Sequence, residues 1–291
     1  MNKIAIGTAQ FGMNYGISAQ NLKVNNPEIL NILDFATKNG INFLDTAPTY
    51  GNSEEVLGNI GVNNFNLTTK TRHFPEDSLS PNNIFSLISD FHNSLALMKK
   101  KNIYGLLVHN ADDLLKPGSI KLFDEIIKLK KKGLVSKVGV SVYSKYQINE
   151  IIKRFEVDLI QIPINILDRR LIDDGTLSIL AKKGIEIHAR SIFLQGLLLM
   201  DKKTIPKKFA KWNSLWGIWH QWLNDNNISA LEASICFVSS LPEISKVLVG
   251  VNTKNQLKSI LNCSDLLLPD LPEGFYSDDS QLLNPSNWNN L

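Results

Sequence analysis

Short runs of apolar residues alternate along the chain with longer segments in which apolar residues recur every three or four positions. The short runs have the length and β-branched composition of buried strands, and the longer segments have the spacing of amphipathic helices. One longer segment, NPEILNILDFATKNG, has Pro27 near its start and Gly40 beyond its end, an arrangement typical of a single helix. The predicted strands begin at Ile4, Asn42, Leu67, Ile103, Ser136, Leu159, Ile185 and Val247.

Strict alternation of strand and helix predicts a parallel sheet of the α/β class, and eight such units close into a (β/α)8 barrel, the TIM-barrel fold. A chain of 291 residues with 43% hydrophobic residues is large enough to fill one such barrel. We therefore expect residues 1–291 to form a single barrel domain, with a polar tail over residues 269–291 that lies outside the repeat.

The composition excludes several classes of function. A formal net charge of +3 gives no support for nucleic-acid binding, and no apolar stretch approaches the roughly 20 residues of a membrane span. The cysteines, Cys236 and Cys263, have neither disulfide nor metal spacing, which is typical of a reducing compartment. The five histidines show no pairing that would indicate a metal-dependent hydrolase. The sequence thus predicts a cytoplasmic protein without a metal centre.

Side-chain alternation along the predicted strands separates the residues that face the helices from those that face the barrel lumen. In IEIHARS, the apolar residues share the face toward the helices, so Arg190 points into the lumen at the end of its strand. The same rule places further polar side chains at the C-terminal ends of strands, where barrel enzymes build their active sites. These side chains are Asp45, Lys70, His109 and Gln161.

Four residues near this face have complementary chemistry. Asp45, Lys70 and His109 come from three successive strands, and Tyr50 follows Asp45 in the loop DTAPTYG. A charged lysine beside the phenol is expected to lower the pKa of Tyr50, which could then act as a general acid or base. His109 could donate a hydrogen bond to an oxygen that develops negative charge. Because the four occur together, a catalytic site is favoured over separate, hydrogen-bonded core groups.

These motifs resemble those of the aldo/keto reductases, NAD(P)H-dependent oxidoreductases built on a (β/α)8 barrel. The resemblance covers nearly the whole chain, from GTAQFG to GVNTKNQL, and rests on DTAPTYGNSE, TTK and LLVHN. It implies that Tyr50 protonates the carbonyl oxygen of an aldehyde or ketone and that Lys70 tunes Tyr50. Asp45 would hold Lys70, and His109 would orient the carbonyl. The implied cofactor is NADPH, with NADH as the alternative.

The resemblance also implies the cofactor contacts. Ser141 and Gln161 would hold the nicotinamide carboxamide, although Val142 replaces the asparagine that usually follows the serine. Alternatively, the Ser141 and Gln161 side chains could satisfy buried backbone groups. Arg190 stands where many members have an aromatic residue; it could stack on the nicotinamide, bind a substrate anion or pair with Glu186. Asn252 stands where an arginine often binds the 2′-phosphate. The implied set is Gly7, Thr8, Asp45, Ser141, Gln161, Arg190, Ser191, Gly250, Asn252 and Gln256.

Other residues are open to more than one interpretation. Ser53 and Glu54 belong to the family motif, but we interpret both as caps of the following helix. His73 could equally belong to a substrate loop or to the ordinary surface. Four tryptophans recur at helical spacing and are predicted to form a core stripe: Trp212, Trp216, Trp219 and Trp222.

The substrate is indicated only by resemblance. GTAQFGMNYGI and RSIFLQGLL are similar to a bacterial branch of the family found with surface-sugar genes, which suggests a sugar or sugar-nucleotide carbonyl. The alternative is a regulatory barrel subunit that binds the cofactor with little or no turnover, as in channel-associated members.

Overall fold

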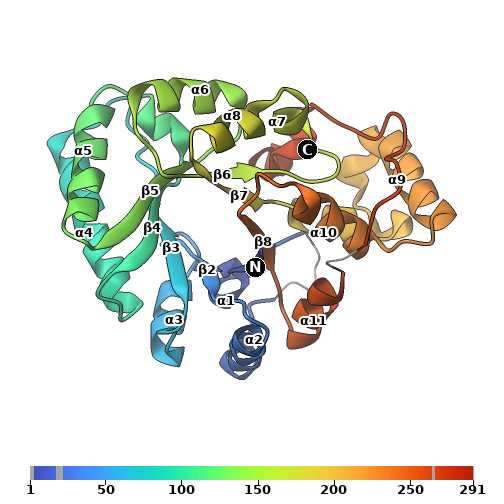
Figure 1. Ribbon diagram of the computed structural model, residues 1–291, viewed down its shortest axis with the longest axis horizontal. Helices are drawn as coiled ribbons and strands as arrows, with labels where there is room; N and C mark the ends of the chain where they lie inside the picture. Colours follow the sequence, from blue (N-terminus) through green and yellow to red (C-terminus); the bar gives the residue numbers. More distant parts are fainter. Residues whose placement is uncertain (1–2, 18–21, 264–265, 291) are drawn as a thin grey trace.

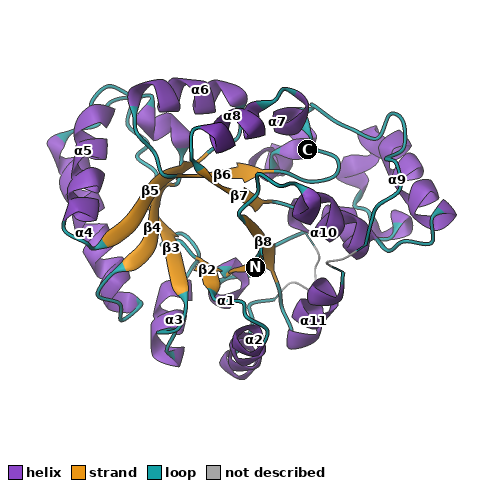
Figure 2. Ribbon diagram, in the orientation of Figure 1, coloured by secondary structure: helices purple, strands orange, loops and turns teal. Residues whose placement is uncertain are grey.

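The computed structural model describes residues 3–17, 22–263 and 266–290 and confirms the barrel. Its eight strands are parallel, pair in sequence order, and close where β8 pairs with β1 (Figure 2). All eight predicted strands are present. They are β1 (Ile4–Gly7), β2 (Phe43–Asp45), β3 (Asn66–Lys70), β4 (Ile103–Val108), β5 (Val135–Ser141), β6 (Leu159–Pro163), β7 (Glu186–Arg190) and β8 (Lys246–Gly250).

Helices form the outer ring around the strands (Figures 1 and 2). The predicted helix NPEILNILDFATKNG is α2; the Asn25 side chain caps its start, and Gly40 adopts a φ of 73° beyond its end. The α-helices are α1 (Ala9–Gly12), α2 (Asn26–Lys38), α3 (Ser53–Ile60), α4 (Pro81–Leu97), α5 (Ser119–Lys131), α6 (Lys145–Arg154), α7 (Arg170–Asp173), α8 (Thr176–Lys182), α9 (Asn213–Asp225), α10 (Ala230–Ser240), α11 (Lys254–Asn262) and α12 (Ser280–Leu283). Short 3-10 helices are η1 (Ala111–Leu114), η2 (Leu194–Leu199), η3 (Lys202–Thr204), η4 (Lys207–Trp212) and η5 (Pro285–Asn290).

The strand register brings the predicted site residues to one end of the barrel. Gly7 pairs with Asp45 on one side and with Gly250 on the other, so the ends of β1, β2 and β8 lie at one level. Ser141 pairs with Gln161 in the same way. Because parallel strands end at the same face, these residues share the barrel mouth, as the alternation rule predicted.

The opposite end of the lumen is closed by a polar network around Glu186. Its carboxylate accepts a hydrogen bond from the Tyr104 hydroxyl at 2.6 Å, lies 2.6 Å from His188 Nε2, and pairs with Lys137. Burial acts to raise the pKa of Glu186, but these partners outweigh burial and hold it at about 2. The expected alternative in which Glu186 pairs with Arg190 is therefore wrong, because the partners of Glu186 lie lower in the lumen.

A second apolar core lies between α9, which projects from the ring in Figure 1, and the C-terminal tail. The predicted tryptophan stripe is confirmed, since Trp212, Trp216, Trp219 and Trp222 are all buried there. The tail supplies the opposite side of this core. The Phe275 ring stacks on Trp219 with ring centroids 4.9 Å apart. The tail, predicted from its composition to be polar, thus contributes buried residues: Phe275, Leu282, Leu283 and Trp288.

Two further observations concern the described part of the chain. Cys236 and Cys263 are both buried and are not joined in a disulfide. Among the described residues, no helix is long and apolar enough to cross a membrane, and no group of three or more His, Cys, Asp or Glu side chains could hold a metal ion.

Replacing Trp288 with alanine should lower the free energy of unfolding by about 3–5 kcal/mol, because it leaves a cavity against Phe209 and α9. The measurement is chemical denaturation followed by circular dichroism. Tyr276→Ala is the matched control, because Tyr276 is a tail aromatic that is 59% exposed. Its effect should stay within about 0.5 kcal/mol. Equal stability of Trp288→Ala and the unaltered protein would show that the tail does not complete this core.

Candidate active site

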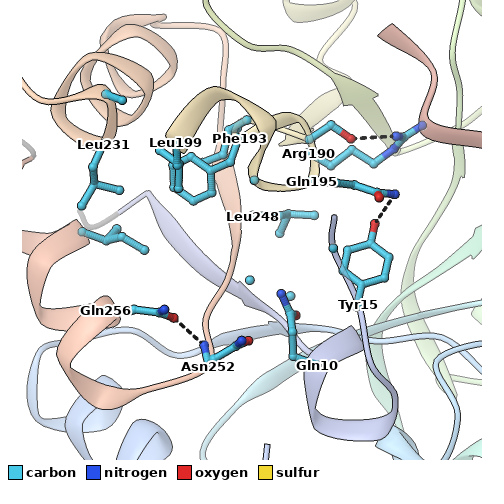
Figure 3. A pocket seen from close by; sticks show the side chains of 18 of the residues that line it. Gln10, Tyr15, Arg190, Phe193, Gln195, Leu199, Leu231, Leu248, Asn252 and Gln256 are labelled. Carbon is cyan, nitrogen blue, oxygen red and sulfur yellow. Dashed lines mark hydrogen bonds between the residues drawn. The ribbon is translucent and has the colours of Figure 1, made fainter. Parts of the chain in front are cut away.

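A cleft of about 1400 Å³ opens over the C-terminal ends of the strands. It extends from Tyr50 and His109 across the barrel mouth to the first turn of α11, where Asn252 and Gln256 form part of its wall (Figure 3). Of the residues predicted for catalysis and cofactor binding, Lys70 and Thr8 are buried beneath this cleft. The others line it: Gly7, Asp45, Tyr50, His109, Ser141, Gln161, Arg190, Ser191, Gly250, Asn252 and Gln256.

Asp45 and Lys70 form a buried ion pair at the floor of the cleft, with Lys70 Nζ 2.7 Å from Asp45 Oδ2. Their side chains are 5% and 1% exposed, so neither charge is solvated. The Asp45 carboxylate also accepts hydrogen bonds from Thr68 and Gln161, and the Lys70 ammonium donates to the Thr46 carbonyl at 2.8 Å. Every one of these contacts directs a donor at Asp45 or an acceptor at Lys70.

The ion pair sets the direction of two pKa shifts. Burial acts to raise the pKa of Asp45, but the charge of Lys70 and the hydrogen bonds outweigh it and hold the pKa below its ordinary value. Burial also lowers the pKa of Lys70, and the nearby carboxylate opposes that shift. The pair thus retains an ionised carboxylate where water is excluded.

The backbone around Tyr50 is fixed by two glycines. A Cβ atom at Gly12 would collide with the Tyr50 carbonyl oxygen, and a Cβ atom at Gly51 would collide with the Gly12 carbonyl oxygen. Gly51 also has a φ of 59°, which side chains disfavour. The absence of both side chains lets α1 pack directly against the loop that carries Tyr50.

Ser53 and Glu54 do not cap α3, so that prediction is wrong. Asn52 occupies the N-cap position, and its side chain makes no capping bond. The Ser53 hydroxyl instead donates to the loop after β1, lying 2.8 Å from Thr8 Oγ1 and 3.0 Å from the Thr8 carbonyl oxygen. Glu54 is buried and accepts hydrogen bonds from Thr69 and Ser94. Both residues therefore fix the site loops to the barrel.

The pKa of the Tyr50 phenol is shifted in the direction opposite to the one expected. Burial and then the charge of Asp45 raise the pKa of Tyr50 above its ordinary value, and the charge of Arg190 only partly opposes them. Lys70 does not reverse this, because its ammonium lies over the ring face, 4.9 Å from the centroid, and its hydrogen bonds go to Asp45 and Thr46. The predicted lowering of the Tyr50 pKa is thus wrong, and the phenol is protonated.

His109 lies beside Tyr50, with the ring centroids 6.1 Å apart and the rings nearly perpendicular. Burial, followed by the charge of Lys70, lowers the pKa of His109 to about 3. The imidazole is therefore neutral at ordinary pH. A neutral ring next to a neutral phenol offers two polarised donors without adding charge to the cleft.

Ser141 and Gln161 contact other site residues. Gln161 Nε2 donates to Asp45 Oδ1 at 2.9 Å, and Ser141 Oγ accepts a hydrogen bond from Arg190 Nε at 3.2 Å. Neither side chain serves a buried backbone group through these bonds. Both remain at the cleft surface, adjacent to the ion pair.

The far end of the cleft is the start of α11. Thr253 caps this helix by accepting the Gln256 N–H, and Gln256 Oε1 accepts the Asn252 N–H at 2.7 Å (Figure 3). The Lys254 N–H donates to Glu28 Oε1 of α2 at 2.7 Å. Groups of this chain thus already accept three of the backbone donors at this helix start.

Comparison with known proteins identifies the family of the chain. A model of the aldo/keto reductase family matches residues 3–271. The chain belongs to the aldo/keto reductase family. It is an oxidoreductase, and members of this family act on small-molecule carbonyl compounds.

Three similar proteins have sequence identities below 25% to this aldo/keto reductase. The uncharacterized oxidoreductase YqkF of Bacillus subtilis (strain 168) is 24% identical over 291 residues, covering 91% of this chain and 92% of that protein. The glycerol dehydrogenase AKR11B4 from Gluconobacter oxydans has a TM-score of 0.68 at 21% identity and covers 93% of this chain and 88% of its own. The putative aldo-keto reductase PA4992 from Pseudomonas aeruginosa has a TM-score of 0.65 at 19% identity, with 90% and 89% covered. These two structures support the fold alone.

Several residues that line the cleft were not predicted from the sequence. Gln10 lies in α1, Tyr15 follows that helix, Tyr143 follows β5, and Gln195 follows β7. Their only signal was position, since each follows the C-terminal end of a strand. His73 is half exposed, lies 3.1 Å from the Asp113 carboxylate, and is not among the described residues that line the cleft.

Asp45→Asn should lower the free energy of unfolding by about 3–5 kcal/mol, because it leaves the Lys70 ammonium buried without a countercharge. Urea denaturation near pH 7 measures this. Since the pKa of Asp45 is held low, its stabilisation is present above the ordinary carboxyl pKa of about 3.9, and the difference should shrink as the pH falls further.

Asp34→Asn is the control for loss of a carboxylate, because Asp34 pairs with Lys38 on exposed α2. It should cost about 0.5 kcal/mol or less. Equal costs for the two substitutions would contradict the buried pair.

Proposed function

We propose that this protein reduces an aldehyde or ketone to an alcohol, using a nicotinamide cofactor. The observation that carries the proposal is a protonated, half-buried Tyr50 beside neutral His109 at the reacting end of the cleft, above the Asp45–Lys70 pair. A carbonyl oxygen placed between Tyr50 and His109 would meet two neutral hydrogen-bond donors. Reduction needs such donors, because negative charge develops on this oxygen as hydride reaches the carbonyl carbon.

The cleft suits a long, polar cofactor. Its volume of about 1400 Å³ exceeds that of an ordinary small-ligand pocket, about 300–1000 Å³. Gly7 and Gly250 add no side chains of their own to the cleft wall, and Ser141 and Gln161 offer a hydroxyl and an amide beside the reacting end. A reduced nicotinamide, when bound, supplies the hydride. We assign Ser141 and Gln161 to its carboxamide and the segment from Gly250 to Gln256 to its adenosine end.

Four residues have one role each in this mechanism: Asp45, Tyr50, Lys70 and His109. The Tyr50 hydroxyl transfers its proton to the carbonyl oxygen, and His109 holds that oxygen by a hydrogen bond from its neutral ring. As the phenolate forms, the Lys70 ammonium, 4.9 Å from the Tyr50 ring centroid, stabilises it. Asp45 keeps Lys70 in place. Lys70 thus acts on the phenolate formed during the reaction, although it does not lower the pKa of the resting phenol.

Tyr50→Phe should reduce kcat/KM for aldehyde reduction by a factor of about 10²–10⁴, because the proton donor is lost while the ring is kept. Cofactor affinity, measured by quenching of tryptophan fluorescence, should stay unchanged. Unaltered turnover in Tyr50→Phe would refute the assigned role.

A regulatory barrel with little turnover is the competing function. A rapid-mixing experiment distinguishes a reductase from a regulatory barrel. The protein with bound NADH or NADPH is mixed with an aldehyde, and oxidation of the cofactor is monitored by absorbance. Oxidation within one catalytic cycle supports a reductase, whereas tight cofactor binding without oxidation of the nicotinamide by any aldehyde would favour regulation.

The start of α11 favours NADH as the cofactor, rather than the NADPH that the resemblance first suggested. A helix start attracts phosphate through its free N–H groups and its positive dipole end. Here Glu28 Oε1 accepts the Lys254 N–H, and this bond holds the pKa of Glu28 below its ordinary value. The Lys254 ammonium lies over the Phe35 ring, 5.7 Å from the centroid. An ionised carboxylate therefore occupies the helix start, next to the cleft residues Thr253 and Asn255, and would repel a 2′-phosphate.

Glu28→Gln keeps an acceptor for the Lys254 N–H and removes the charge. It should raise the affinity for NADPH relative to NADH by about three- to tenfold, since one carboxylate near the phosphate is lost. Fluorescence titration with both cofactors measures this ratio. Asp34→Asn, on the same helix, should leave the ratio unchanged. Preference for NADPH in the unaltered protein would overturn the cofactor assignment without affecting the reductase assignment.

A further inference from the structure

Arg190 carries an uncompensated positive charge at the reacting end of the cleft. Its guanidinium donates to three neutral oxygens: Ser141 Oγ, Ser191 Oγ and the Val142 carbonyl. Its Cζ lies 4.2 Å from the centroid of the Tyr143 ring. In the described part of the chain, no carboxylate lies within ion-pair distance of Arg190. Three of its five N–H groups are thus satisfied, which leaves two for a ligand.

The remaining cleft charges do not neutralise this cation. Among the described residues that line the cleft, the acids are Asp45 and Asp201. The charge of Asp45 is matched by Lys70 at 2.7 Å. Asp201 follows η2, where its charge acts on His220. The reacting end of the cleft therefore carries a net positive charge.

Two neutral donors lie next to Arg190. Figure 3 shows Arg190, Gln195 and Tyr15 along one side of the cleft. Gln195 Nε2 lies 3.5 Å from the Tyr15 hydroxyl oxygen, which leaves the hydroxyl hydrogen free to point into the cleft. Burial raises the pKa of Tyr15 to about 12, so this hydroxyl remains a donor at ordinary pH. Arg190 and Tyr15 present N–H and O–H donors to the cleft, and the Gln195 amide adds further N–H donors beside its carbonyl oxygen.

The segment that follows Arg190 and carries Gln195 has an unusual backbone. Ser191, Leu194 and Gln195 have φ values of 58°, 48° and 53°. Such conformations cost about 1–3 kcal/mol each and persist at binding sites where the surrounding structure enforces them. This backbone fixes Gln195 at the cleft, close to Arg190 at the end of β7.

We propose that Arg190, Tyr15 and Gln195 form an anion-binding corner for a carboxylate or phosphate group of the carbonyl substrate. This inference rests on the proposed reductase function and names the substrate class: an aldehyde or ketone that carries a negative group close to its carbonyl. Acidic or phosphorylated sugars have this chemistry. The anion would pair with the guanidinium and accept a hydrogen bond from Tyr15.

The pyrophosphate of the cofactor is the other possible source of a negative group. The position of Arg190 favours the substrate, because the Arg190 charge acts on the pKa values of Tyr50 and His109, at the reacting end. The start of α11, assigned above to the adenosine end of the cofactor, lies across the cleft in Figure 3.

The test compares matched aldehydes with and without an anion: 4-carboxybenzaldehyde with benzaldehyde, and glyceraldehyde 3-phosphate with glyceraldehyde. The unaltered protein should prefer each charged aldehyde by about tenfold or more in kcat/KM, the size expected of a charge-assisted hydrogen bond. Arg190→Gln should abolish this preference mainly through KM, and Arg190→Lys should restore part of it. Affinity for NADH should change little in either variant.

Lys145→Gln is the matched control, because it removes an exposed cation outside the residues that line the cleft. It should leave the preference unchanged. Equal use of charged and neutral aldehydes by the unaltered protein would overturn the inference, as would a loss of NADH affinity in Arg190→Gln that matches the loss of the charged substrate.

Calorimetric binding of 4-carboxybenzaldehyde and benzaldehyde separates this inference from the reductase assignment, because it needs no turnover. Tighter binding of the carboxylate that depends on Arg190, without reduction of any aldehyde, would support the anion corner and count against the reductase. Turnover without any charge preference would support the reductase and overturn the corner.

Discussion

The buried carboxylate of Asp45 organises the site. Its two oxygens accept hydrogen bonds from Lys70 and Thr68 of β3 and from Gln161 of β6. One charge therefore connects β2, β3 and β6 at the barrel mouth. The same charge raises the pKa of the neighbouring phenol of Tyr50. A negative group that cannot reach water must be matched by protein donors, and the barrel supplies them. Stability of the lumen and chemistry of the cleft therefore depend on one interaction.

The sequence predicts the barrel well, because strand and helix periodicities are local. Each of the eight apolar runs became a strand, and the alternation rule placed Asp45, Gln161 and Arg190 at the mouth. The electrostatics were harder to predict, since they depend on distances between segments. The effect of Lys70 on Tyr50 depends on whether its ammonium lies at the hydroxyl or over the ring, and no sequence motif encodes that difference.

Around Arg190 and in the tail, too, local features are predictable from the sequence, whereas contacts between distant segments are not. Arg190 was expected at the cleft, but its partner, the Val142 carbonyl, belongs to a different strand end and leaves no sequence signal. The four tryptophans were correctly assigned to a core. Their packing partners could not be inferred, because Phe275 and Trp288 lie in a segment whose polar composition indicates no core.

The tail also reaches the cleft, since Pro285 and Ser286 of η5 form part of its wall. Docking of the tail onto α9 and completion of the cleft are thus parts of one process. By thermodynamic linkage, any molecule that contacts this wall must favour the docked tail over the released one. Occupancy of the cleft would then slow hydrogen exchange and proteolytic cleavage near the C-terminus, far along the chain from the residues that perform the chemistry.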